Sequence, residues 1–218
     1  MQSVFKNKFL LVIIICSSLL TLYFVIQKNF LSTSSVASED IAIDISVDHI
    51  EDSNIILDIK DCGDSIGSLN DVTVYLNSGG IMSCDGVRNL NPDGYSYGIK
   101  WQCVEFVRRY YYDYLDHKMP NRYGHASDYF RRAIPSGSMN SERNLLQYHN
   151  GDIRPQKNDI LVWAGTYGHV AIVINVTDTT VSTIAQNVGE NCIEDLSLNE
   201  NTISGGCVGF LRKQTTQD

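Results

Sequence analysis

The chain has 218 residues, which is enough for one domain with a buried core and a tail. Apolar residues make up 43% of it and charged residues 19%, which is typical of a globular protein and argues against a disordered one. The formal net charge of −8 argues against nucleic acid as the main partner, because binding to phosphates requires a basic surface.

The N-terminal segment indicates export. Residues 9–26 contain no charged side chain and follow Lys6 and Lys8. As a helix this segment would span about 27 Å, just enough to cross the hydrocarbon core of a bilayer. We therefore predict a cytoplasmic basic region at 1–8 and a transmembrane signal anchor at 9–26, with the rest of the chain outside the cytoplasm. The alternative is a signal peptide cleaved near Ala37, which would make the domain a secreted one.

Residues 27–60 are predicted to form an acidic linker that leads to the folded domain. Between residues 39 and 71 the chain carries ten Asp or Glu residues against a single lysine, Lys60. Apolar and polar residues alternate over 41–50, which predicts a half-buried strand within the linker. Most arginines follow residue 100, so we expect the domain itself to be more balanced in charge.

Beyond the linker, the pattern predicts a strand, then helices, then further strands. Gly- and Asn-rich turns close an apolar stretch at 65–80, which predicts one strand. Apolar residues share one helical face over 101–115, and a second helix is predicted at 126–134. The later strand-like runs are 160–164, 169–176, 180–187 and 207–213. A helical half followed by an antiparallel half predicts the α+β class.

Four of the six cysteines form an even set that suits an oxidising compartment: Cys62, Cys84, Cys192 and Cys207. Three connectivities are possible for this set. We expect Cys62–Cys84 and Cys192–Cys207, because local pairing closes the shortest loops, and the other pairings remain open. Cys103 is then an odd thiol, either a buried free cysteine or a nucleophile.

The position of Cys103 favours a nucleophile. We expect it in the first turn of the 101–115 helix, where unpaired backbone N–H groups stabilise a thiolate. His169 opens an apolar strand directly after a glycine, so its ring is expected to reach the mouth of a cleft beside the sheet. A helix-start thiol and a strand-start histidine, with a polar residue on the next strand, are the parts of an activated cysteine nucleophile.

The sequence around these residues resembles a known family. "WQCVEFVRRYY", "GHVAIV" and "QNV", in this order, are similar to CHAP domains, which are cysteine- and histidine-dependent amidohydrolases or peptidases. The strongest likeness is to the amidase domain of glutathionylspermidine synthetase/amidase. The resemblance places the domain at 61–213, followed by a tail at 214–218. It implies a papain-like α+β fold, with N-terminal helices packed on an antiparallel β-sheet.

The resemblance also implies roles for the site residues. Cys103 would attack an amide carbonyl and His169 would activate it. The backbone N–H of Cys103, assisted by the side chain of Gln102, would stabilise the oxyanion.

The third member of the site departs from the family pattern. The family usually has Glu-Gln-Asn on the strand after the histidine strand, whereas this chain has Ala185, Gln186 and Asn187. An alanine cannot accept a hydrogen bond from the imidazole. Residues two apart on a strand share a face, so we expect Asn187 to replace the glutamate and Gln186 to point the other way. Cys-His-Asn is a working arrangement in thiol proteases.

Three functions remain open. Hydrolysis of an amide bond in peptidoglycan peptides suits an exported domain of this family. A glutathionylspermidine-type amidase suits the sequence likeness and an acidic protein that attracts a cation. An inactive, membrane-tethered binding module would follow if Ala185 abolishes activity.

The expected partners are therefore a peptide or cell-wall amide substrate, and the membrane through residues 9–26. We expect no metal and no other cofactor. Some members of the family bind calcium, but the acidic loop at 91–98 is expected to be a solvated turn. The sequence does not predict the oligomeric state.

Overall fold

The computed structural model describes residues 60–77, 84 and 86–214. The predicted anchor at 9–26 and the predicted strand at 41–50 lie outside these residues and stay predictions. Within the described part of the chain, no helix is both long and apolar enough to cross a membrane.

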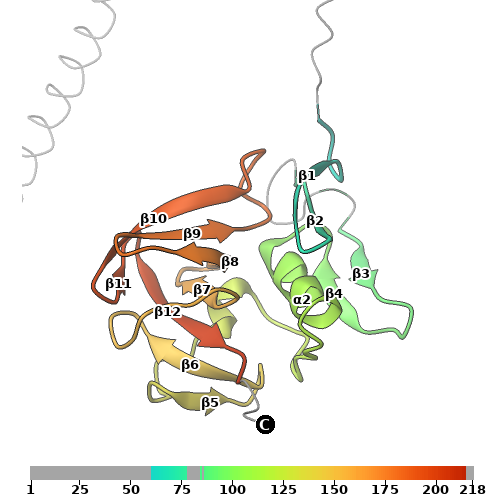
Figure 1. The fold of residues 1–218 in the computed structure, drawn as a ribbon. Helices are drawn as coiled ribbons and strands as arrows, with labels where there is room; N and C mark the ends of the chain where they lie inside the picture. Colours follow the sequence, from blue (N-terminus) through green and yellow to red (C-terminus); the bar gives the residue numbers. More distant parts are fainter. Residues whose placement is uncertain (1–59, 78–83, 85, 215–218) are drawn as a thin grey trace, which may run out of the picture. The chain divides into compact units, whose positions relative to one another are not determined.

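An eight-stranded antiparallel sheet forms the centre of the fold (Figure 1). Its strands are β5 (Ser138–Asn140), β6 (Leu145–His149), β7 (Ile160–Trp163), β8 (His169–Val176), β9 (Thr180–Ile184), β10 (Ile193–Asn199), β11 (Thr202–Ile203) and β12 (Cys207–Arg212). Across the sheet their order is β11-β10-β9-β8-β7-β12-β6-β5. The last strand therefore lies between β6 and β7 and joins the two parts of the sheet.

One α-helix and two hairpins precede the sheet in the described part of the chain. The helix α2 (Cys103–Asp113) contacts β8 of the sheet and one strand of each hairpin, as Figure 1 shows. The hairpins are β1 (Ser65–Leu69) with β2 (Val72–Tyr75), and β3 (Arg88–Leu90) with β4 (Ser96–Ile99). The β1–β2 turn has two residues with positive φ, which is typical of a type I′ turn. The single strand predicted at 65–80 is therefore a hairpin.

The central strands bury both faces, because alternate residues point to opposite sides of the sheet. Ile160 and Val162 of β7 lie in the core beneath α2, together with Phe106 and Val107 of the helix. Leu161, between them in sequence, belongs to a second core on the other face. The helix thus covers one face of the sheet only.

The predicted fold class is wrong. The described residues are mostly β-sheet with a single α-helix, rather than an α+β fold with N-terminal helices. The second predicted helix, at 126–134, is only a four-residue 3-10 turn, Ala126–Tyr129. Its continuation is prevented by Gln147 of β6, whose side chain accepts from the backbone N–H of Arg131 at 3.0 Å and donates to its carbonyl at 2.9 Å. These backbone groups are no longer available for a helix.

The predicted strands at 160–164, 169–176 and 207–213 are confirmed as β7, β8 and β12. The strand predicted at 180–187 is confirmed in its first part, since β9 ends at Ile184. The sequence analysis missed β10, whose first three residues are exposed and therefore lack an alternating pattern.

Candidate active site

A cavity of about 310 Å³ opens at the N-terminal end of α2. Cys103 and His169 both line it, and so do Gln102 and Asn187. These residues come from the start of α2, the start of β8 and the segment after β9. The structure therefore brings all four predicted site residues to one cleft.

Cys103 is the first residue of α2 and is 6% exposed. The preceding residue, Gln102, occupies the N-cap position without a side-chain capping bond. Burial raises the pKa of the Cys103 thiol, and hydrogen bonds from the backbone of Val170 and Val104 offset only part of this effect. The thiol is therefore protonated at neutral pH, in contrast to the thiolate expected from a helix start, and its attack requires a base.

His169 opens β8 opposite Trp163 of β7, and the centroids of their rings lie 5.7 Å apart. Gly168 precedes it with a φ of +67°, and a Cβ atom there would lie 2.5 Å from the carbonyl oxygen of Trp163 and 2.6 Å from the backbone nitrogen of Ser127. A glycine is therefore required for β8 to begin at the cleft. Burial lowers the pKa of His169 to about 4, so its imidazole is neutral and able to accept a proton.

Acid is expected to destabilise the fold through His169. The pKa of its imidazole is about 4 in the folded protein against 6.5 for a model histidine, so the folded state binds fewer protons in this interval. The free energy of unfolding should therefore fall by roughly 3 kcal/mol as the pH drops from above 6.5 to below 4. We expect His169→Gln to remove this part of the fall in urea unfolding experiments at pH 7, 5 and 3.5. An identical fall in the variant would contradict a half-buried, neutral imidazole.

Asn187 reaches the cleft from beyond the end of β9, with a φ of +67°. Its Nδ2 donates to Oε1 of Gln102 at 3.0 Å. Ala185 is buried at 5% exposure and is not among the described residues that line the cavity. Asn187 rather than Ala185 therefore presents a polar group to the cleft, and it contacts the predicted oxyanion residue. Its role as the third catalytic member stays a prediction.

Residues 93–187 match the family model of the CHAP domain. The chain contains a CHAP domain. The matched range holds every residue that the sequence analysis assigned to catalysis, from Gln102 and Cys103 to Asn187. No curated protein matches the chain at a significant level, and the closer relationship to glutathionylspermidine amidase is not confirmed.

Gln186 of the CHAP domain points away from the cleft, into a buried polar network. Its Nε2 donates to Glu105 Oε2 at 2.7 Å and to the carbonyl of Gln102 at 3.2 Å. Its Oε1 accepts from the backbone N–H of Tyr75 at 2.9 Å. Gln186 thereby ties the start of α2 to β2, a structural role that the sequence analysis did not predict.

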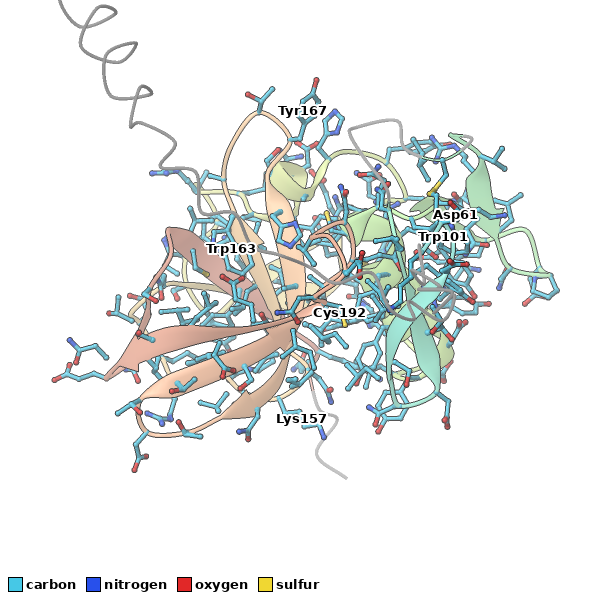
Figure 2. The ribbon with its side chains drawn as sticks, turned by 90° about the horizontal axis from the view of Figure 1, so that it is seen from above. Asp61, Trp101, Lys157, Trp163, Tyr167 and Cys192 are labelled. Carbon is cyan, nitrogen blue, oxygen red and sulfur yellow. A yellow bond between two sulfur atoms is a disulfide. The ribbon has the colours of Figure 1, made fainter. Side chains whose placement is uncertain are left out.

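The basic residues of the cleft were also missed. Arg88, Arg108 and Arg122 line the cavity, whereas none of its described lining residues is Asp or Glu. Two exposed aromatic residues, Tyr123 and Tyr167, also line the cavity, and Figure 2 shows Tyr167 on the loop between β7 and β8. No short motif surrounds Arg88, so only the pairing of β3 with β4 beside α2 brings it to the site.

The predicted pairing of the cysteines is confirmed in part. Cys62 and Cys84 form a disulfide, and Cys103 is free. The predicted Cys192–Cys207 bond is wrong, because both thiols are free and buried. Cys192 lies in the core beneath α2, whereas Cys207 lies in the core on the opposite face of the sheet. The sheet separates the two sulfurs, although their separation in the sequence is short.

Proposed function

We propose that this CHAP domain is an exported thiol amidohydrolase or peptidase with Cys103 as nucleophile and His169 as base. The observation that carries the proposal is the shared cleft, in which the first residue of α2 and the first residue of β8 both line one cavity. Burial keeps the thiol protonated and the imidazole neutral, so the mechanism requires a proton to pass from one to the other as the sulfur attacks.

In this mechanism the imidazole of His169 removes the thiol proton as the sulfur of Cys103 attacks the amide carbonyl carbon. The oxyanion receives hydrogen bonds from the backbone N–H of Cys103, at the helix N-terminus, and from the Gln102 amide. The imidazolium then gives its proton to the leaving amine. Water, activated by the same imidazole, hydrolyses the resulting thioester.

Two observations support export, which would bring the domain to peptidoglycan peptides. The Cys62–Cys84 disulfide suits an oxidising compartment. The uncharged segment at 9–26 provides a route out of the cytoplasm. A glutathionylspermidine-type substrate is less suitable, because its polyamine part is cationic and the described cleft lining is basic.

The proposal is tested by incubating the purified full-length chain with muropeptides, with glutathionylspermidine and with a generic peptide amide. Mass spectrometry would identify the released amine and acid. Cleavage of a muropeptide peptide bond supports the proposal, and cleavage of glutathionylspermidine alone would replace the substrate. Failure with all three substrates, together with a Cys103 that does not react with iodoacetamide, would favour the inactive binding module.

Asn187→Ala is expected to lower kcat by about 10-fold to 100-fold, because Gln102 would lose a hydrogen bond that helps to orient its amide. If Asn187 acts through Gln102, the double variant with Gln102→Ala should be no slower than Gln102→Ala alone. If the two substitutions instead lower kcat by the product of their separate effects, and Asn187→Ala shifts the acid limb of the pH–rate profile, then Asn187 acts on the imidazole of His169. Gln186→Ala is unsuitable as a control, since it disrupts the buried network of Glu105.

A further inference from the structure

We propose that the cleft selects substrates with a carboxylate next to the scissile amide, and that Arg88 and Arg122 bind this carboxylate. This inference rests on the proposed function and specifies its substrate class as acidic peptides. Its basis is a local reversal of charge. The chain as a whole carries a net charge of −8, yet three arginines and no carboxylate are found among the described residues that line the cavity.

Arg108 supplies charge but is already bound within the protein. It is 1% exposed, and its guanidinium donates to the hydroxyl of Tyr129 at 2.9 Å and to the carbonyls of Arg122 and Tyr123 at 2.5 and 3.2 Å. These partners are uncharged, so they satisfy its hydrogen bonds without neutralising it. Arg108 therefore fixes the 122–123 segment and adds positive potential behind it.

Arg143 supports the same segment from behind. Its guanidinium lies 4.2 Å from the centroid of the Tyr129 ring and donates to the carbonyl of Tyr123 at 3.4 Å. Arg143 is fully buried and forms no ion pair with any described residue. A second buried cation thus lies beneath this wall of the cleft, where its positive charge would help to stabilise an anion.

Arg88 and Arg122 are the guanidinium groups that a substrate can reach. Arg88 is exposed at the start of β3, with its guanidinium carbon 5.8 Å from the centroid of the Tyr123 ring. Arg122 is half-buried and gives its backbone carbonyl, not its side chain, to Arg108. Within the described residues neither side chain forms an ion pair. The planar guanidinium fork matches a carboxylate in two-point hydrogen bonding.

The first test compares two alkylating agents of similar size and different charge, iodoacetate and iodoacetamide, on Cys103 of the full-length chain. The iodoacetate-to-iodoacetamide rate ratio is expected to fall by about 3-fold to 10-fold in Arg88→Gln and in Arg122→Gln. It should also fall in wild type as salt rises. Arg132→Gln is the matched control, because it removes one exposed arginine that does not line the cleft. Equal ratios in all three variants would overturn the proposal.

The second test does not depend on a reactive thiol. The Cys103→Ala protein is titrated with acetyl-Glu-Ala-amide and acetyl-Gln-Ala-amide, which differ by one carboxylate, and binding is followed by NMR. The glutamyl peptide is expected to bind at least about fivefold more tightly, and Arg88→Gln or Arg122→Gln should remove this preference. Equal binding, or binding of neither peptide at millimolar concentration, would contradict carboxylate selection. If Cys103 does not react in the first test and the glutamyl peptide still binds more tightly in the second, the proposed hydrolase activity is rejected and the proposed preference for an acidic ligand is kept.

Discussion

Cys103→Ala is expected to reduce amide hydrolysis by at least about 10³-fold while leaving the fold intact. The side chain lies in the cleft at the first residue of α2, and no other described cysteine lines this cavity. Removing one buried sulfur should cost only about 1–2 kcal/mol of stability, so a folded protein remains for assay. Hydrolysis is measured as amine release, and the thioester intermediate as a mass increase of the protein after acid quenching.

Cys207→Ala is the matched control for this experiment. Cys207 is also a free, buried thiol, but it lies in the core on the face of the sheet away from α2. The control should lose a similar amount of stability and keep its kcat within about twofold. Retained turnover in Cys103→Ala, or an equal loss in Cys207→Ala, would remove Cys103 from the mechanism.

The second large effect is expected from Glu105→Gln, which should lower the free energy of unfolding by about 3–5 kcal/mol. Glu105 is fully buried and pairs with Arg109 at 2.6 Å. It also accepts hydrogen bonds from Asn89 at 2.8 Å and from Gln186 at 2.7 Å. Neutralising it leaves the Arg109 guanidinium without a counter-charge on α2, the helix that carries Cys103. Chemical denaturation at pH 7 would measure the loss.

A surface ion pair provides the control for Glu105. Arg131 and Glu142 are 3.2 Å apart with side chains 43% and 37% exposed, so Arg131→Gln should change stability by less than about 1 kcal/mol. In Glu105→Gln combined with Arg109→Met, part of the lost stability should return, because the uncompensated cation is gone. A Glu105→Gln variant as stable as Arg131→Gln would show that this network does not stabilise the domain.

Parts of the site were predictable because they depend on short-range patterns. The helical spacing around Cys103 and the apolar run after His169 are local, and both elements formed as expected in α2 and β8. Asn187 was placed from its spacing to Ala185 along a strand. The structure keeps it at the cleft but bonds it to Gln102, since the chain leaves β9 before reaching it.

Other features depended on partners that local patterns do not include. The 126–134 segment has a helical pattern, yet its backbone binds a glutamine from a distant strand. Cys192 and Cys207 are near in sequence, yet they belong to cores on opposite faces of one sheet. In both cases the outcome depends on how the strands of the sheet are arranged in space, which the periodicity of a segment does not report.

The sequence by itself determined the candidate nucleophile, its candidate base and the elements that carry them, because each of these depends on a few consecutive residues. Only the tertiary structure decided the character of the cleft. Arg88, Arg122 and His169 come from a hairpin, a loop and a sheet strand, and they meet because strand order and helix packing set the distances between them. The same packing lowers the pKa of His169 to about 4, since burial is a property of the assembled core and not of the segment.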